Sequence, residues 1–270
     1  MSTIIYPSPI FGPVKSRRLG ISLGINLMPA DGKVCTFDCI YCECGLNGDH
    51  RAKLPRPKRE DVAEALEQKL KKMYQDGELP DVLTFAGNGE PTAHPQFAGI
   101  IDDTIRLRNL YCPDAKVSVL SNATMLDHPQ VFQALMKVDN NIQKLDTVDN
   151  DYIRMLDRPV SPDYDVQNVI EHLKAFNGHV IIQTMFLKGA RSKEQSLSII
   201  NPRLSTLDNT GEEYVGPWLE TVKKIAPQSV MIYTIDRETP VEGLEKASRE
   251  QLDAIRDRVI AAGIPCTASY

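Results

Sequence analysis

The 270-residue sequence contains no apolar run long enough to cross a membrane. Its first 20 residues also lack the charged start and the long apolar stretch of a signal peptide. We find no internal repeat, no low-complexity segment and no clear linker between domains. These absences predict a globular cytoplasmic protein, in a compartment where thiols stay reduced. Clustered cysteines there favour metal binding or redox chemistry over a disulfide framework.

Charge is unevenly distributed along the chain. The net charge is −5, which argues against a protein wrapped in nucleic acid. Residues 1–59 nevertheless carry a net charge of +5, so the remainder carries −10. The stretch "HRAKLPRPKRE" (50–60) holds five basic residues before its first acid. It predicts either a solvated, proline-stiffened loop or a local contact with a phosphate-bearing or otherwise anionic partner.

Short apolar runs alternate with segments of helical periodicity. Strands separated by helices pair in parallel through right-handed crossovers, and runs that are apolar on both faces suit a sheet covered by helices. This spacing does not distinguish an open doubly wound sheet from a full or partial β/α barrel. In either fold the chemistry collects at the carboxyl ends of the strands. The six predicted strands are 21–26, 81–87, 116–122, 142–147, 179–187 and 229–236.

Two segments outside the predicted strands carry further expectations. The stretch from about 186 to 214 is the longest without clear periodicity, and a loop of this length in a compact domain is often functional. We expect it to border the substrate opening. A C-terminal helix is expected at about 248–262, in "SREQLDAIRDRVIAAG".

Four of the six cysteines lie in "CTFDCIYCECG", residues 35–45. Structural zinc commonly takes two separated Cys pairs, which this tight group does not provide. A dithiol redox site would use only Cys39 and Cys42 and would leave Cys35 unexplained. An iron–sulfur cluster accepts a closely spaced run of cysteines, and these spacings let three thiolates hold three corners of a cubane. The fourth iron then stays open to a small molecule. Cys44 is expected to be a bystander near the cluster or, alternatively, a ligand or hydrogen-atom donor in the active site.

A second motif, "FAGNGEPT" (85–92), sits where a predicted strand ends. Gly87 and Gly89 allow the backbone to approach a ligand closely or to adopt a positive φ. A backbone carbonyl and the Glu90 carboxylate, turned inward, would receive an ammonium group. Alone, such a run is more often a simple turn, but one strand after the cysteine loop it is a much stronger signal.

These motifs resemble those of the radical S-adenosylmethionine (SAM) superfamily. "CTFDCIYC" resembles its cluster loop, with Tyr41 in the aromatic position, and "GNGEP" resembles its motif for the SAM ammonium group. The stretches "GPVKSRRLGISLGIN", "KLDTVDNDYIRMLDRP", "QTMFLKG" and "YTIDR" are similar to a stand-alone subgroup of wyosine-synthetase-like iron–sulfur oxidoreductases. The resemblance covers nearly the whole chain. It implies a single domain over residues 1–270, folded as an α/β, partial (β/α)6 TIM-like barrel of parallel strands with outer helices.

The resemblance also implies the cofactors and their contacts. A [4Fe–4S] cluster would be held by Cys35, Cys39 and Cys42, and SAM would chelate its fourth iron. One electron would then cleave SAM to methionine and a 5′-deoxyadenosyl radical, which takes a hydrogen atom from a substrate. The residues implied to contact SAM are Tyr41, Gly87, Asn88, Gly89, Glu90, Ser121, Asn122, Lys144, Asp146, Gln183 and Tyr233.

Two of these residues have simpler interpretations. Asn122 could cap the following helix, as Asn often does. Asp146 could form an ordinary ion pair with Lys144 or Arg154.

Three interpretations of the activity remain open. The first is modification of a nucleic-acid base, such as a base of tRNA bound through the basic stretch 51–59. The second is a radical SAM enzyme acting on a protein or a metabolite, including activation of a glycyl-radical partner. The third is a non-catalytic module that binds zinc or a cluster. For an enzyme we expect a monomer without a membrane partner, reduced by a one-electron donor of the flavodoxin or ferredoxin type.

Overall fold

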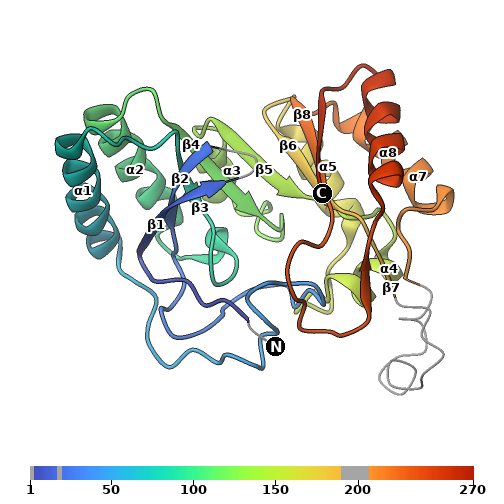
Figure 1. The fold of residues 1–270 in the computed structure, drawn as a ribbon, viewed down its shortest axis with the longest axis horizontal. Coiled ribbons are helices and arrows are strands. Elements are labelled where there is room, and N and C mark those ends of the chain that lie inside the picture. The colour runs from blue at the N-terminus through green and yellow to red at the C-terminus, as the bar shows by residue number, and fades with distance from the viewer. Residues whose placement is uncertain (1–2, 17–19, 190–206) are drawn as a thin grey trace. The chain divides into compact units, whose positions relative to one another are not determined.

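A computed structural model of the chain describes residues 3–16, 20–189 and 207–270. These residues form two compact units (Figure 1). The N-terminal unit comprises Ile4–Thr36 and Asn47–Gln143, and the C-terminal unit comprises Phe37–Leu46 and Lys144–Tyr270 together with the start of the chain. The cysteine loop is therefore divided, with Cys35 in the first unit and the three following cysteines in the second.

The N-terminal unit is a mostly parallel sheet with helical crossovers. Its strands have the order β1-β2-β3-β4-β5. β1 pairs antiparallel with β2, whereas β2, β3, β4 and β5 pair in parallel. The strands are β1 (Ile10–Ser16), β2 (Gly20–Ile25), β3 (Val82–Phe85), β4 (Lys116–Ser121) and β5 (Asn140–Lys144), of which the last residue, Lys144, belongs to the C-terminal unit. The helices are α1 (Arg59–Asp76), the short 3₁₀ helix η1 (Pro91–Ala93), α2 (Phe97–Tyr111) and α3 (Pro129–Leu135).

Apolar periodicity forms the core of this unit. Helix α1 buries Val62, Leu66, Leu70 and Met73, which recur every three or four positions and make one apolar face. It ends at Gly77, whose left-handed conformation suits a C-terminal cap. β3 is buried along its whole length, and its Phe85 meets Phe97 of α2 edge to face, with ring centroids 6.1 Å apart. This packing fixes the end of β3, from which the glycine-rich motif continues.

The C-terminal unit repeats the strand–helix alternation. β6 and β10 both pair in parallel with β8, whereas β7 and β9 form a separate antiparallel pair. The strands are β6 (Ile181–Met185), β7 (Leu187–Gly189), β8 (Ser229–Tyr233), β9 (Leu244–Lys246) and β10 (Cys266–Ser269). The helices are α4 (Asn150–Leu156), α5 (Val166–Ala175), α7 (Glu212–Ile225) and α8 (Arg249–Ala261).

Trp218, on the buried face of α7, anchors that helix. Its ring packs edge to face on Phe186, and its indole Nε1 donates a hydrogen bond to the carbonyl of Leu145 at 3.1 Å. Trp side chains bury a large apolar area and usually find a partner for the N–H group. The bond fixes the chain directly after β5, where Asp146 follows.

The parallel strands lie close to their predicted positions. The strand predicted at 142–147 lies earlier in the structure, where β5 begins at Asn140 and ends at Lys144. Its first two residues are asparagines, so its start does not stand out as an apolar run. The antiparallel edge strand β1 was not predicted. Most of the stretch expected to border the substrate opening, residues 190–206, lies outside the described residues. None of the helices in the described part of the chain is long and apolar enough to span a bilayer.

Candidate functional site

The start of the cysteine loop is hydrogen-bonded to the glycine-rich turn after β3. Val34, immediately before Cys35, donates its N–H to the carbonyl of Asn88 at 2.9 Å. The carbonyl of Val34 accepts from the N–H of Glu90 at 3.3 Å, so that Val34 and Gly89 form a parallel bridge. Two motifs more than 50 positions apart in the sequence are thereby joined by backbone bonds within the N-terminal unit.

The bridge requires the two glycines of the turn. Gly89 has φ of +139°, and a Cβ atom there would lie 1.8 Å from the carbonyl oxygen of Val34. Gly87 has φ of +135°, and a Cβ would lie 2.8 Å from the side chain of Asn26. Both values fall where residues with a side chain are strained. Gly89 therefore allows the close approach of the turn to the cysteine loop, and both glycines have the positive φ that was predicted as one of two possibilities.

Glu90 connects this turn to the end of β4. Its carboxylate is 2% exposed and accepts from the Thr92 N–H at 3.0 Å, the Thr92 hydroxyl at 2.5 Å and the Asn122 N–H at 2.7 Å. Burial raises the pKa of Glu90, and these hydrogen bonds oppose the rise. The result is an anchored acidic group at the carboxyl edge of the strands.

The side chain of Asn88 is hydrogen-bonded to backbone groups near the start of the chain. Its amide nitrogen donates to the carbonyls of Tyr6 at 2.9 Å and Pro29 at 3.0 Å, and its Oδ1 accepts from the Tyr6 N–H at 2.8 Å. Asn26, at the end of β2, binds the same segment through the Tyr6 and Pro7 carbonyls. Any contact of Asn88 with a ligand would therefore involve its backbone, since its side chain has three protein partners.

Asn122 and Ser121 shape the chain after β4. The Asn122 amide donates to the Thr36 hydroxyl at 2.8 Å and lies 3.7 Å from Cys35 Sγ. Its Oδ1 accepts from the Thr124 N–H at 3.1 Å, and Ser121 Oγ accepts from the Ala123 N–H at 3.0 Å. Because α3 begins only at Pro129, Asn122 does not cap a helix but forms a local turn that reaches the first cysteine.

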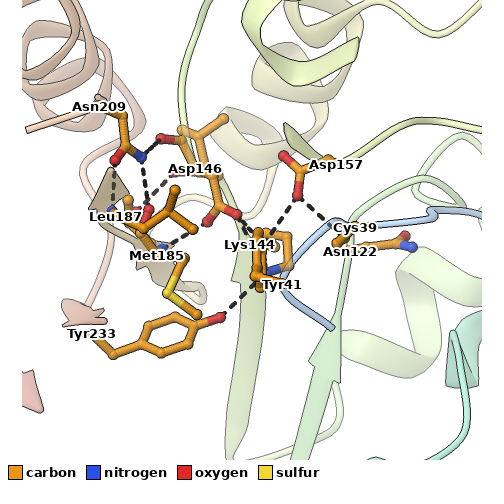
Figure 2. Close-up of polar contacts among 12 residues, drawn as sticks. Cys39, Tyr41, Asn122, Lys144, Asp146, Asp157, Met185, Leu187, Asn209 and Tyr233 are labelled. Carbon is orange, nitrogen blue, oxygen red and sulfur yellow. Dashed lines mark hydrogen bonds and ion pairs between the residues drawn. The ribbon is translucent and has the colours of Figure 1, made fainter. Parts of the chain in front are cut away.

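In the C-terminal unit, the next part of the cysteine loop carries a buried polar network (Figure 2). The Tyr41 hydroxyl contacts the carboxylates of Asp146 and of Asp157, the latter at 3.0 Å. Lys144 Nζ donates to the same hydroxyl at 2.6 Å and to the Tyr233 hydroxyl at 3.3 Å. Cys39 Sγ donates to Asp157 Oδ1 at 3.3 Å. The network thus includes one of the three predicted cluster ligands.

Burial and charge set the protonation of this network. Burial is the largest single influence on Lys144 and disfavours its charged form, but the Asp146 carboxylate, 3.4 Å away, together with Tyr233, Cys39 and Asp157 outweighs it and holds the lysine pKa above its ordinary value. Burial, together with the Asp146 charge, raises the pKa of Asp157 to about 8. The raised pKa favours the protonated form of Asp157, and the geometry pairs Lys144 with Asp146.

Asp146 is held from two directions. Its Oδ1 accepts from the Met185 N–H at 2.8 Å, which fixes the carboxylate beyond the end of β5 (Figure 2). Asn209 donates to the backbone carbonyls of Asp146 at 3.3 Å and Met185 at 2.7 Å, and accepts from the Leu187 N–H at 2.9 Å. Asn209 is fully buried and ties together the chain segments that follow β5 and β6.

The predicted site residues thus fall into two groups. The first group lies in the N-terminal unit: Cys35, Gly87, Asn88, Gly89, Glu90, Ser121 and Asn122. The second lies in the C-terminal unit: Cys39, Tyr41, Cys42, Lys144, Asp146, Gln183 and Tyr233. Gln183 is buried in the middle of β6, where its carbonyl accepts from the Leu145 N–H. Hydrogen bonds connect most members within each group.

Among the residues of these networks that sequence reasoning missed are Asn26, Asp157 and Asn209. Asp157 follows the last residue of α4, and its partner Cys39 is 118 positions away in the sequence. Asn209 and Asn26 bind backbone groups, which every residue has, so the amino-acid sequence does not indicate these partners. The one available signal was a carboxylate between a helix and a proline in "MLDRP", and it does not identify a partner.

The thiols suit a metal centre in their chemistry. All six cysteines lie in the described residues and none forms a disulfide, so Cys35, Cys39 and Cys42 are available as thiolate ligands. Across residues 3–16, 20–189 and 207–270, no three His, Cys, Asp or Glu side chains are already gathered around one point as metal ligands. Three thiols within eight positions remain a donor set that iron–sulfur clusters accept.

The other cysteines have different surroundings. Cys44 is buried within the loop. Cys112 is buried at the end of α2, and burial raises its pKa to about 11. Cys266 lies in β10, and burial raises its pKa to about 12. The raised pKa values keep Cys112 and Cys266 as neutral thiols at physiological pH.

Comparisons with known proteins extend these observations. The model of the radical SAM superfamily matches residues 31–194. A "UPF0026 protein" of Helicobacter pylori (strain ATCC 700392 / 26695) is 32% identical over 199 residues, which are 72% of this chain and 61% of that protein. The chain therefore spans about three fifths of the length of this relative.

Solved structures with the same fold include two of particular interest. A radical SAM methyltransferase from Sphaerobacter thermophilus has a TM-score of 0.63 at 13% identity, covering 92% of this chain and 66% of that one. TYW1 with a lysine-pyruvate adduct bound has a TM-score of 0.58 at 12% identity, covering 89% and 73%. These likenesses confirm the predicted fold class, an α/β partial barrel of mostly parallel strands. The match over residues 31–194, which is more than half of the chain, shows that the chain belongs to the radical SAM superfamily and is an enzyme of that type.

Proposed function

We propose that the protein cleaves SAM reductively at a [4Fe–4S] cluster and uses the resulting 5′-deoxyadenosyl radical to abstract a hydrogen atom from a substrate. The observation that supports this proposal most directly is the backbone bridge between Val34 and Gly89. It holds the start of the "CTFDCIYC" loop against the "GNGEP" turn, which are the two motifs that this chemistry needs side by side. The cofactors supply the electron transfer and bond cleavage, and the protein supplies position and shielding.

Cys35, Cys39 and Cys42 would hold the cluster as thiolates. Cys35 directly follows Val34, which is bridged to Gly89, and its other neighbour, Thr36, accepts a hydrogen bond from Asn122. Cys39 is held by Asp157. The three ligands thus come from one short loop whose two halves are fixed by separate hydrogen bonds.

The turn from Gly87 to Glu90 would receive the SAM ammonium group. Glu90 supplies a buried carboxylate, and the glycine backbone permits a ligand to approach its carbonyls. Tyr41 would lie near the adenine, with its hydroxyl fixed by Lys144 and Asp146. The remaining proposed SAM contacts are Ser121, Asn122, Lys144, Asp146, Gln183 and Tyr233.

The test is anaerobic. The protein is reconstituted with iron and sulfide, reduced and given SAM, and 5′-deoxyadenosine is assayed. Wild type should bind about four irons and form 5′-deoxyadenosine, whereas Cys39→Ala should do neither. Cys44→Ala is the matched control, because it removes a buried thiol of the same loop and should leave both readouts intact. Zinc as the sole bound metal, with intact SAM, would instead support the non-catalytic module.

For the substrate, we propose a nucleic-acid base, with tRNA as the first candidate. The supporting observation is the placement of the stretch 51–59, in which Arg51, Lys53 and Lys58 are exposed. Arg59, by contrast, is paired with Asp103 at 2.6 Å. Exposed lysines and arginines that contact phosphates give binding that weakens steeply with salt.

Filter binding of tRNA across a salt series checks this. The triple variant K53Q/R56Q/K58Q should bind more weakly with a shallower salt slope. The variant K69Q/K71Q/K72Q removes the same charge from α1 and should bind like wild type. Equal losses in both variants would indicate a nonspecific charge effect. Absence of salt-sensitive binding would favour a protein or metabolite substrate, including a glycyl-radical partner.

The electron is proposed to come from a one-electron donor of the flavodoxin or ferredoxin type, and the enzyme is proposed to act as a monomer. Replacing the chemical reductant by reduced flavodoxin in the 5′-deoxyadenosine assay tests the donor. Sedimentation of the reconstituted protein at assay concentration tests the monomer.

A further inference from the structure

The loop that follows Cys35 is bound to the end of helix α4 in the C-terminal unit. Asp38 donates its N–H to the carbonyl of Asp157 at 2.9 Å, and Ile40 donates to the carbonyl of Leu156 at 3.0 Å. The last carbonyls of a helix lack partners within the helix. The extended loop supplies those partners, so alternate residues of the loop are fixed on the helix end.

Side chains strengthen the same contact. Ile40 is fully buried, and the Phe37 ring meets Tyr164 edge to face with centroids 5.4 Å apart. Tyr164 belongs to the chain between α4 and α5, which Arg154 braces by donating to the carbonyls of Pro162 and Tyr164. The loop therefore rests on a surface that is itself ordered.

The side chain of Asp157 stands between two functional side chains of the loop. Its Oδ1 accepts from Cys39 Sγ at 3.3 Å and from the Tyr41 hydroxyl at 3.0 Å (Figure 2). Asp157 is 1% exposed and Cys39 is 8% exposed. A buried acceptor shared by two donors fixes both of them, because leaving either donor unsatisfied away from water costs free energy.

We infer that Asp157 is a positioning residue, which sets Cys39 and Tyr41 in place before any cluster is bound. This inference rests on the proposed function only in taking Cys39 as a cluster ligand. Oδ1 is the atom that acts, so the amide of Asn, which keeps that oxygen, should substitute for the carboxyl group. Alanine should not.

The first test uses the cluster-free protein. Wild type, D157N and D157A are reduced, exposed to iodoacetamide without oxygen, and the rate of alkylation at each cysteine is followed by tandem mass spectrometry. Cys39 should react about tenfold faster in D157A, the effect of losing one hydrogen bond, whereas D157N should stay within about twofold of wild type. Cys266 provides the reference rate within each protein.

D165A is the matched control, because Asp165 caps α5 through the Gln167 N–H in the same unit. It should leave the Cys39 rate unchanged. An unchanged Cys39 rate in D157A, or an equally fast rate in D157N, would overturn the inference. If D157A does not fold by circular dichroism, D157S, whose hydroxyl is too short to reach both donors, takes its place.

The second test follows reconstitution. D157A should give a reduced-cluster electron paramagnetic resonance spectrum that is broader than wild type or reduced in intensity, and D157N should restore the wild-type spectrum. A wild-type spectrum in D157A would contradict a role toward the cluster. Because alkylation is measured without cofactors, failure of SAM cleavage in every protein would refute the proposed function and leave the positioning result standing.

Discussion

Cys35 and Cys39 lie four positions apart in one loop, yet the protein surrounds them differently. Around Cys35 the contacts come mainly from uncharged groups, namely the Asn122 amide, the hydroxyls of Thr36 and Thr124 and backbone groups of the glycine turn, and the buried Glu90 carboxylate beside them is itself held by uncharged donors. Around Cys39 the groups are ionisable: Asp157 directly, and through Tyr41 the Lys144–Asp146 pair. The two surroundings depend on different physics.

The neutral side depends on close backbone approach, and so on the absence of a side chain at Gly89. The surroundings of Cys39 depend on charge balance, because each buried ion needs its counter-ion. Substitutions that change charge should therefore be most harmful near Cys39, and substitutions that add volume should be most harmful near Cys35. The predictions below test this contrast, beginning with the largest expected effect.

Lys144→Met should have the largest effect. It leaves the buried Asp146 without a cation and removes the donor to Tyr41, so unfolding free energy should fall by about 3–5 kcal/mol. Chemical denaturation of the cluster-free protein measures the loss. Adding Asp146→Asn, which keeps an acceptor for the Met185 N–H, should recover part of it. A double variant no more stable than Lys144→Met would show that charge balance is not the cause.

Gly89→Ala should destabilise the neutral side by about 3 kcal/mol or more, since it combines an unfavourable φ with a clash against Val34. The reconstituted variant should also hold less iron. Gly48→Ala is the control, because a Cβ there would have no atom within 4 Å. Equal stability of the two variants would mean that the Val34 bridge is dispensable.

Asn122→Ala should cost less, about 1–2 kcal/mol, because it removes neutral hydrogen bonds to Thr36 and Thr124 at a partly buried site. Denaturation compares it with Lys144→Met. If Asn122→Ala proved the more harmful of the two, the proposed contrast between neutral and charged surroundings would be reversed.

His94 should give the smallest effect, visible as a pH dependence. Its Nε2 lies 2.9 Å from the Pro57 carbonyl and its Nδ1 accepts from the Gln96 N–H, so the neutral ring fits. Burial lowers the pKa of His94. As pH falls through the ordinary value of histidine, the unfolded chain takes up a proton that the folded protein resists, so stability should fall. The loss of stability at low pH should be smaller in His94→Gln than in wild type, and the exposed control His128→Gln should lose as much as wild type.

The sequence predicted where the parallel strands lie, because each is a short apolar run between helical segments. Lys144 and Asp146 were expected at the end of a strand, and the structure pairs them, as the simpler interpretation of Asp146 also foresaw. Which carboxylate would meet Cys39 could not be predicted, because Asp157 is brought there by the fold of α4. Periodicity reports which face of a helix is buried, but not which loop lies across its end.

The edge strand β1 and the role of Asn88 escaped prediction for a related reason. β1 contains a proline, and its pairing with β2 has an irregular register between Phe11 and Val14, so the alternation that marks a strand is lost. Asn88 stands in a motif that suggested a ligand, whereas its side chain binds Tyr6 and Pro29. A motif identifies a local backbone shape, and the direction of each side chain depends on neighbours distant in the sequence.

The basic stretch, finally, is not a free arm. The bridge between Lys33 and Arg51 fixes its beginning, Asp31 accepts from the N–H groups of Lys53 and Leu54, and His94 binds the carbonyl of Pro57. A chain fixed at both ends and in the middle has already lost most of its backbone entropy on folding. A phosphate-bearing partner would therefore contact charges at set spacings, and its binding would require little further ordering of this segment. Its recognition would depend on shape as well as on charge.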